Sequence, residues 1–388
     1  MPHNATNAYG YRPFAGGQTP QTDQPLLIDG NDPDFPNDYW DHVDFVMNEI
    51  EKRGMYLAAL PCWGSAFVQA RIRGSQVQFD VNQARLYGQF LGRRYGNRPN
   101  IIWVLGGDID PVNHGVGDQR QVYRAMAEGI GRGATANMTL RWDQAHDDWD
   151  KILMTFHAVQ TPWQNGDKGG SSSIWFHDDA WLDINMMETW AWPESIYRLV
   201  KQDYRRENPV KPTIMGEGAY EYGKYLHECG WVTPRLVRQQ GYHTFFGGAT
   251  GYTYGAYPVW PMWDEECGMH WTQGVLLPGA SQVGNVMKNF LMTYEWWKWE
   301  ILDDEASNAQ GVVSVLTEKN ELLTYLPEAD SVSIQNQVFG AWKEALWFNP
   351  ENGRYQAPTK DSINTEKGQT FYAPEDWEDA ILILKKDE

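Results

Sequence analysis

Apolar positions along the chain follow two alternating patterns. Short apolar runs of strand length are separated by longer stretches in which apolar residues recur at the spacing of an amphipathic helix. The short runs predict strands at residues 55–61, 101–105, 152–157, 184–189, 213–217 and 251–255. The longer stretches predict helices that include residues 39–53, 82–95, 119–132, 193–207 and 233–246. This repetition of strand and helix predicts an α/β fold of the (β/α)8 barrel type.

The pattern changes after about residue 305. Short apolar runs follow one another, and turn-forming residues such as those at 349–353 separate them. These runs predict antiparallel strands at residues 312–316, 321–326 and 380–384. We therefore expect a catalytic barrel over residues 1–304 and a small β-sandwich over residues 305–388. The expected role of the sandwich is to pack against the barrel and stabilise it.

Two predicted strands end in glycine followed by a carboxylate. The run at 101–105 leads into Gly106, Gly107 and Asp108, and the run at 213–217 ends in Gly216 and Glu217. Catalytic residues of α/β barrels lie at the C-terminal ends of the strands. The two carboxylates are about three β/α units apart, with an insertion near residues 165–173. This spacing places them on opposite sides of one barrel mouth, where they can face a common ligand. Paired carboxylates are the catalytic groups of glycoside hydrolysis.

Composition supports a carbohydrate ligand and argues against other partners. The 20 Trp and 20 Tyr residues supply flat rings that suit the faces of sugars. The net charge of −19 repels phosphate backbones and anionic membranes, so we expect no nucleic-acid partner. The sequence contains no run of about 20 apolar residues and no visible export signal, so we expect no membrane span.

The three cysteines, Cys62, Cys229 and Cys267, are odd in number and far apart. We therefore expect buried or half-buried free thiols and neither a disulfide framework nor a CxxC metal site. No recognised metal-ligand spacing is present among His3, His114, His146, Asp147 and Asp148. Because hydrolysis by two carboxylates needs no metal, we expect no metal and no cofactor.

Several other side chains follow predicted strands and are candidates for substrate contact. His157 is expected to donate to the substrate, with a core histidine as the alternative. Glu188 is the rival carboxylate, expected to contact a sugar hydroxyl or to form a buried ion pair. Glu221 is expected either to orient Glu217 or to bind a sugar hydroxyl. Asp110 is expected to cap a helix that begins near Pro111. The aromatic candidates for stacking on a sugar are Trp63, Trp190, Tyr254 and Trp260.

The order of these motifs resembles the apiosidase-like glycoside hydrolases, glycoside hydrolase family 140 and its relatives. The resemblance runs from Asn7 to the C-terminus, and its most specific segments are residues 95–108, 181–185, 211–217, 251–255 and 277–280. It implies a barrel followed by a β-sandwich and retaining hydrolysis, notably release of apiose from the pectin rhamnogalacturonan II. It also implies that Asp108 is the acid/base and Glu217 the nucleophile. Asn7 and Tyr9, where the resemblance starts, complete the predicted substrate-binding set.

The chain departs from the family pattern at two places. The family's first strand and the body of its second would precede Asn7, so we expect a barrel that another element or a neighbouring molecule closes. Ala158 and the segment 187–190 replace residues that are more common in relatives, so the substrate can differ from apiose.

We expect a retaining exo-glycosidase that removes a terminal sugar from a plant or algal polysaccharide. An inverting enzyme with the same carboxylates and a non-catalytic carbohydrate-binding protein are the alternatives. The resemblance suggests a secreted or periplasmic location, and the sequence leaves the oligomeric state open.

Overall fold

The structure is a computed structural model of the 388-residue chain. It describes residues 7, 10–14, 39–64, 68, 79–113, 116–159, 170–189, 193–224, 228–264, 267–302, 311–334, 342–358 and 368–386. The chain divides into two compact units. Unit 1 comprises residues 1–188 and 207–212, and unit 2 comprises residues 189–206 and 213–388.

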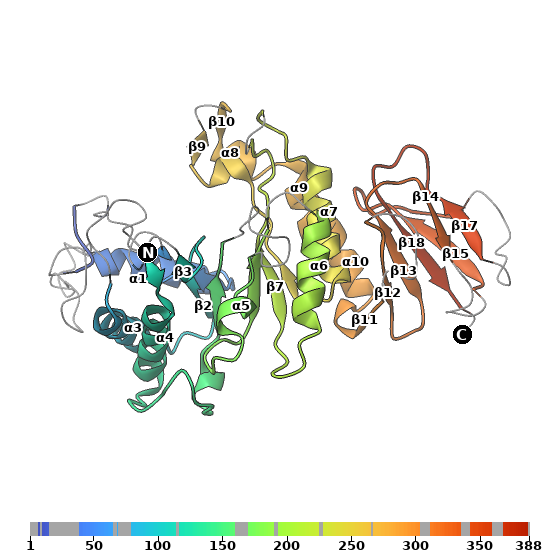
Figure 1. The fold of residues 1–388 in the computed structure, drawn as a ribbon. Helices are drawn as coiled ribbons and strands as arrows, with labels where there is room; N and C mark the ends of the chain where they lie inside the picture. The colour runs from blue at the N-terminus through green and yellow to red at the C-terminus, as the bar shows by residue number, and fades with distance from the viewer. Residues whose placement is uncertain are drawn as a thin grey trace. The chain divides into compact units, whose positions relative to one another are not determined.

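Unit 1 is built on a parallel sheet of three strands in the order β1 (Leu57–Ala59), β2 (Ile101–Gly106) and β5 (Met154–His157). Its central strand, β2, is labelled in Figure 1. Strands β2 and β5 are buried over nearly their whole length, which explains why their sequences are continuous apolar runs. Strand β6 (Asn185–Glu188) follows them, and the Thr155 hydroxyl donates to the Ile184 carbonyl just before it.

Among the described residues of unit 1, the helices are α1 (Tyr39–Lys52), α3 (Val81–Tyr95), α4 (Arg120–Thr135) and the short α5 (Ser173–Phe176). The same residues also form the hairpin of β3 (Val112–Asn113) with β4 (Gly117–Asp118) and the 3-10 turn η2 (Trp149–Lys151). Helix α3 begins at a capping box in which the Asp80 side chain accepts the Gln83 N–H and the Gln83 side chain accepts the Asp80 N–H.

Helices α3 and α4 pack with their backbones in direct contact. A Cβ atom at Gly88 or Gly92 would overlap the carbonyl oxygens of Met126 and Ile130 on the facing helix. Only glycine leaves room for this approach, so the repeated glycines of the two helices are packing residues.

Unit 2 contains a second parallel pair, β7 (Thr213–Glu217) with β8 (Gly251–Tyr252), and helices α6 (Pro193–Tyr204) and α7 (Pro234–Phe246). Thr233 caps α7 by accepting the Leu236 N–H, and Pro234 occupies the first turn. Between β8 and the C-terminal sheet lie η3 (Tyr257–Val259), β9 (Trp263–Asp264), β10 (Met269–His270), α8 (Trp271–Gly274), α9 (Pro278–Ser281), the π-helical η4 (Gln282–Met287), α10 (Lys288–Thr293) and η5 (Trp296–Lys298).

The C-terminal part of unit 2 contains two antiparallel sheets. The larger has the order β11 (Glu300–Ile301), β12 (Val313–Leu316), β13 (Leu322–Leu326), β18 (Ala380–Lys385), β15 (Glu344–Phe348) and β16 (Tyr355–Gln356). The smaller pairs β14 (Ser331–Ile334) with β17 (Gln369–Tyr372).

The inner strands of the larger sheet are buried on both faces. Ile381 and Ile383 of β18 pack in a core with Tyr242 of α7 and Phe290 of α10. Leu382, Leu384 and Ala380 alternate with them and pack in a second core with Val332 and Ile334 of β14 and Phe371 of β17. The first five residues of β18, 380–384, are therefore all apolar because each face of the sheet meets a different partner.

Arg238 of α7 ties the helices of unit 2 to this sheet. Its guanidinium donates to Asp379 at 2.8 Å, just before β18, and to Gln282 of η4 at 2.7 Å. Arg238 also contacts the Glu378 carboxylate at 2.9 Å. Because the Arg238 and Asp379 side chains are buried, the Asp379 charge depends on Arg238 for compensation.

The six strands and five helices predicted before residue 300 are all present, within a few residues of their expected ends. The turn at 349–353 separates β15 from β16 as expected. Within unit 1 the parallel strands β1, β2 and β5 pair, and within unit 2 β7 pairs with β8. A closed eight-stranded barrel stays a prediction. The expected lack of N-terminal strands also stays a prediction, because most of residues 1–38 lie outside the described ranges.

The prediction of free thiols is wrong for two of the three cysteines. Cys229 and Cys267 form a disulfide with their Cα atoms 5.7 Å apart. Cys229 follows β7 and Cys267 lies between β9 and β10, so the bridge joins loops that the sequence separates by 38 residues. Cys62 is a buried free thiol, and burial raises its pKa to about 12. Among the described residues, none of the helices is long and apolar enough to span a bilayer.

Candidate functional site

Asp108 lies in a tight left-handed turn at the end of β2. Gly106, Gly107 and Asp108 have φ values of 88°, 109° and 48°. A Cβ atom at Gly107 would lie 2.9 Å from the Trp63 indole, so glycine is required there both for its backbone and for its lack of a side chain. The turn leaves Asp108 exposed while its two neighbours are buried.

His157, at the end of β5, holds this turn through two hydrogen bonds. Its carbonyl oxygen accepts the Gly107 N–H at 3.1 Å, and its ring Nδ1 accepts the Asp108 N–H at 3.1 Å. Because Nδ1 is an acceptor, the proton of a neutral His157 ring is on Nε2. The position of Asp108 is therefore set by its neighbouring strand.

Glu188, at the end of β6, completes this arrangement. Its carboxylate oxygen lies 3.5 Å from Nε2 of His157, and both side chains are buried. The Glu188 N–H donates to the Gly170 carbonyl, which fixes the backbone at the strand end. Because a His157 ring whose Nδ1 accepts a hydrogen bond is neutral, this contact places the Nε2–H beside the carboxylate without an ion pair. Both readings for Glu188, the buried ion pair and the contact with a sugar hydroxyl, stay predictions.

The structure brings four of the predicted site residues of unit 1 together. Trp63 packs edge-on against the His157 ring, with centroids 6.1 Å apart, so Trp63, Asp108, His157 and Glu188 form one cluster. Asn7 lies in an N-terminal turn, where its side chain accepts the Tyr11 N–H. Tyr9 and Trp190 lie outside the described residues.

The predicted helix near Pro111 is wrong. Residues 112–113 form β3, and the next described helix, α4, begins at Arg120, so Asp110 caps no helix at Pro111. Asp110 is half-buried, and this desolvation raises its pKa to about 6. The left-handed backbone at Gly106, Gly107 and Asp108 is followed by the β3–β4 hairpin instead of a helix.

In unit 2, Glu217 ends β7 and is half-buried. The Tyr220 hydroxyl donates to Oε1 of Glu217 at 2.5 Å. A donated hydrogen bond favours the ionised form of a carboxylate and fixes its orientation. The sequence alone does not identify Tyr220 as this donor, because its only signal is its place in the turn three residues after the strand.

Glu221 is buried, and only 1% of it is exposed. One oxygen accepts the Tyr254 hydroxyl at 2.5 Å and the other accepts the Gly279 N–H at 3.1 Å. Its backbone also bonds to the residues around Tyr254, since the Glu221 N–H donates to the Gly255 carbonyl. Burial raises the pKa of Glu221 and of Tyr254. These contacts join the loop after β7 to the loop after β8, and none of them involves Glu217. Both readings for Glu221, orienting Glu217 and binding a sugar hydroxyl, stay predictions.

Neither unit taken by itself supplies a complete metal site among its described residues. His157 and Glu188 are metal-binding residue types, but within unit 1 they contact each other and make only two ligands, whereas catalytic zinc takes three from the protein. The expectation that the reaction needs no metal stays a prediction.

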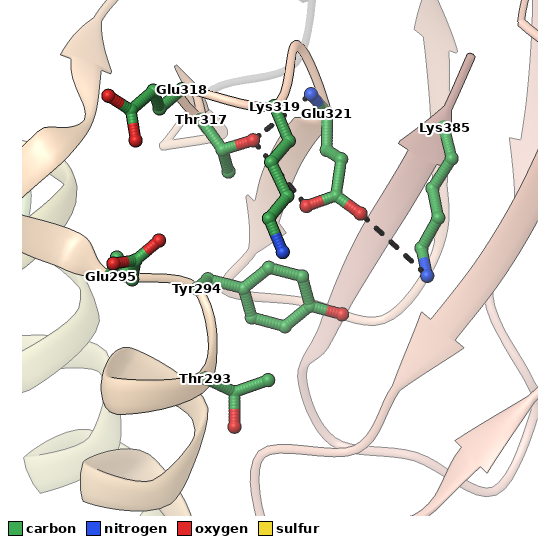
Figure 2. A pocket seen from close by; sticks show the side chains of 8 residues that line it. All are labelled: Thr293, Tyr294, Glu295, Thr317, Glu318, Lys319, Glu321 and Lys385. Atoms are coloured by element: carbon green, nitrogen blue, oxygen red, sulfur yellow. Dashed lines mark hydrogen bonds and ion pairs between the residues drawn. The ribbon is translucent and has the colours of Figure 1, made fainter. Parts of the chain in front are cut away.

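A surface hollow of about 170 Å³ lies elsewhere in unit 2, between the end of α10 and the β12–β13 hairpin (Figure 2). Glu321 lies 3.7 Å from Nζ of Lys385, and Lys298 contacts both Glu295 and Glu318. Its acidic groups are thus balanced by lysines, and none of the predicted site residues lines it.

Comparisons with known proteins agree with the resemblance. The family described as "Apiosidase-like, catalytic domain" matches residues 3–298, and the family described as "Putative collagen-binding domain of a collagenase" matches residues 299–385. The two matches meet at residues 298 and 299, whereas the sequence pattern places the domain boundary after residue 304. No curated protein matches the chain.

Solved structures show the same fold. A crystal structure of a glycoside hydrolase family 5 protein from Bacteroides vulgatus is 24% identical, with a TM-score of 0.75, and the match covers 98% of this chain and 80% of that one. A second structure, described as a glycoside hydrolase, is 24% identical with a TM-score of 0.73 over 99% of this chain and 84% of that one. Since the family match covers most of the sequence, the chain belongs to the apiosidase-like catalytic-domain family and is a glycosidase.

Proposed function

We propose that this enzyme is a retaining exo-glycosidase that removes a terminal sugar from a plant or algal polysaccharide side chain. The observation that carries the proposal is the turn at Gly106, Gly107 and Asp108, which His157 holds at the end of β2. A strained turn that leaves a carboxylate exposed at a strand end is typical of a functional site.

The proposed fold of the catalytic domain is a (β/α)8 barrel. The six strands at their predicted places and the family match over residues 3–298 support it. In such a barrel the ends of β2 and β7 would share one face, so that Asp108 and Glu217 would serve one substrate. The pairing rests on these strand positions and on the family resemblance.

In the proposed mechanism, Glu217 attacks the anomeric carbon while Asp108 gives its proton to the leaving oxygen, and the glycosidic bond breaks. Asp108 then takes a proton from water, whose oxygen attacks the anomeric carbon and releases Glu217. Tyr220 supports the first step because its hydroxyl orients the attacking carboxylate. His157 and Glu188 support both steps by holding the backbone of Asp108 in place.

The substrate and location are also proposals. Ala158 and residues 187–190 differ from the residues more common in relatives, so the released sugar can be one other than apiose. Pectin is one candidate source of the substrate. The Cys229–Cys267 disulfide supports a secreted or periplasmic location, since disulfides persist in oxidising compartments. We propose that the C-terminal sheets stabilise the catalytic domain, supported by the buried contact of Arg238 with Asp379.

A panel of 4-nitrophenyl glycosides and plant oligosaccharides tests this function. We expect the wild-type enzyme to release one terminal sugar with retention at the anomeric carbon, as read by NMR of the first product. Asp108→Asn and Glu217→Gln should each lower kcat by at least about a thousandfold on oligosaccharides, with an exposed Asp150→Asn as control. Full activity in Glu217→Gln would overturn the proposed mechanism. An inverted product would show the inverting alternative, and binding without turnover would show the non-catalytic one.

A further inference from the structure

Five exposed apolar side chains occur within one short stretch of unit 2. They are Trp260, Met262, Trp271, Val275 and Leu276, with exposed fractions of 72%, 57%, 37%, 48% and 80%. Single exposed apolar residues are ordinary, but a group of them marks a binding surface. We call these five residues the apolar patch.

The backbone beneath the apolar patch is well fixed. Met262 and Trp271 are joined by a hydrogen bond of 3.0 Å from the Trp271 N–H to the Met262 carbonyl. Strands β9 and β10 pair between them, and His270 caps α8 with a capping box. Figure 1 shows β9, β10 and α8 grouped together. The Cys229–Cys267 disulfide then ties this group to the loop after β7. The exposed side chains are therefore held on an ordered scaffold.

The segment that carries the apolar patch starts and ends beside the loop that follows Glu217, the proposed nucleophile. Tyr254 precedes it and Gly279 follows it, and both donate hydrogen bonds to the Glu221 carboxylate. Glu221 lies four residues after Glu217 on the same loop. The patch thus belongs to a structure that is anchored next to the end of β7.

The chemistry of the apolar patch fits sugar rings that carry no charge. Two indoles and neighbouring aliphatic groups suit the apolar faces of sugars. Asp264 ends β9, and the whole chain has a net charge of −19. Negative charge disfavours a polymer of uronic acids.

We propose that the apolar patch binds a neutral glycan chain, the part of the substrate that extends beyond the sugar to be released. This proposal rests on the proposed function and names the substrate class for it. Exposed indoles stack on successive sugar rings, while Met262 and Leu276 fill the space beside them. A uronic-acid polymer is disfavoured by the net charge of −19.

Affinity electrophoresis of the whole chain tests the proposal. Glu217→Gln protein, which should leave the polymer intact, is run in gels containing xyloglucan, galactomannan or polygalacturonan. We expect at least one neutral polymer to retard the protein and polygalacturonan to have no effect. Adding Trp260→Ala and Trp271→Ala to the Glu217→Gln protein should weaken its affinity for the neutral polymer, measured by the retardation, about tenfold. Trp297→Ala, which removes an indole 51% exposed outside the patch, is the matched control and should change nothing.

Four results would overturn the proposal: no retardation by either neutral polymer, retardation that the two tryptophan substitutions leave unchanged, stronger binding of polygalacturonan, or a dimer in sedimentation that Trp260→Ala dissociates. The last would show that the patch binds a second copy of the chain.

Hydrolysis of 4-nitrophenyl glycosides by the wild-type enzyme separates this test from that of the proposed function. Cleavage of these small substrates without polymer retardation means that the patch proposal fails and the function holds. If polymer retardation depends on Trp260 but Glu217→Gln hydrolyses the small substrates at the wild-type rate, the patch proposal holds and the proposed function fails.

Discussion

At the scale of single residues, the turn that presents Asp108 combines two requirements. Gly106 and Gly107 supply backbone angles that other residues adopt at a cost, and Trp63 fills the space beside Gly107. The sequence motif identified Asp108 as a strand-end carboxylate. It could not reveal that His157 accepts hydrogen bonds from the turn, because that contact depends on which strand lies beside β2.

Gly107→Ala tests the turn. We expect the new methyl group to clash with the Trp63 ring and to disfavour the φ of 109°, at a cost of about 1 to 3 kcal/mol in the free energy of unfolding. Because Asp108 would move, kcat should fall by more than the stability loss explains. Steady-state kinetics and urea unfolding measure both, with Gly284→Ala, which has open space around it, as control. Unchanged kcat in a folded variant would argue against this role of the turn.

Asp183 gives unit 1 a pH-dependent stability. Burial raises its pKa from 3.8 to about 7, although its carboxylate accepts the Met154 N–H at 2.7 Å. The folded state therefore binds the proton more tightly than the unfolded state. This contribution to stability is complete below about pH 4 and is lost as the pH rises through about 7.

Asp183→Asn should remove this dependence, since an amide oxygen can accept the same N–H without a buried charge. We expect the variant to gain on the order of 2 kcal/mol relative to the wild type between pH 4 and pH 8. Urea unfolding at pH 4, 6 and 8 measures the gain, and the exposed Asp147→Asn is the control. A difference that does not vary with pH would contradict the assignment.

At the scale of elements, the strands and helices before residue 300 were predictable because each carries its own periodicity and end signals. Asp80 and Gln83 mark the start of α3, and Thr233 with Pro234 marks the start of α7. The disulfide was not predictable, since no local spacing relates Cys229 to Cys267. Their meeting depends on the loops after β7 and β8 lying side by side.

Removing this disulfide should destabilise unit 2. A cross-link over 38 residues contributes up to about 4 kcal/mol if it acts by restricting the unfolded chain. The Cys229→Ser/Cys267→Ser double variant should therefore unfold at lower denaturant concentration than the wild type under oxidising conditions. Under reducing conditions the two proteins should unfold alike, and Cys62→Ser is the control for a cysteine outside the bridge. Equal stability of the two proteins when oxidised would show that the bridge contributes nothing.

At the scale of the whole molecule, the alternation of apolar residues predicted the C-terminal strands, but only the structure shows why residues 380–384 of β18 are all apolar. One face of its sheet packs on α7 and α10, and the other on β14 and β17. The domain boundary after residue 304 stays a prediction. The pattern that suggested it changes gradually, and β11 at Glu300–Ile301 already pairs with β12.

The buried pair of Arg238 and Asp379 couples α7 to this sheet. Arg238→Met leaves the Asp379 carboxylate without its cation, which should lower the free energy of unfolding by about 3 to 5 kcal/mol. The double variant Arg238→Met/Asp379→Leu removes both charges and should recover much of that loss. Denaturant unfolding measures both, with the partly exposed Arg235→Met as control. A double variant that is no more stable than the single one would show that the charge pair is not the cause.

The central claim is that Glu217 forms a covalent bond to the sugar while Asp108 handles the proton. The most direct measurement is mass spectrometry of Asp108→Ala after mixing with the 4-nitrophenyl glycoside that the wild-type enzyme cleaves. A good leaving group needs no acid, but water needs the base, so the glycosyl-enzyme should accumulate. The account predicts a peptide that carries the sugar on Glu217. A sugar on Glu188, or turnover at the wild-type rate with no adduct, would contradict it.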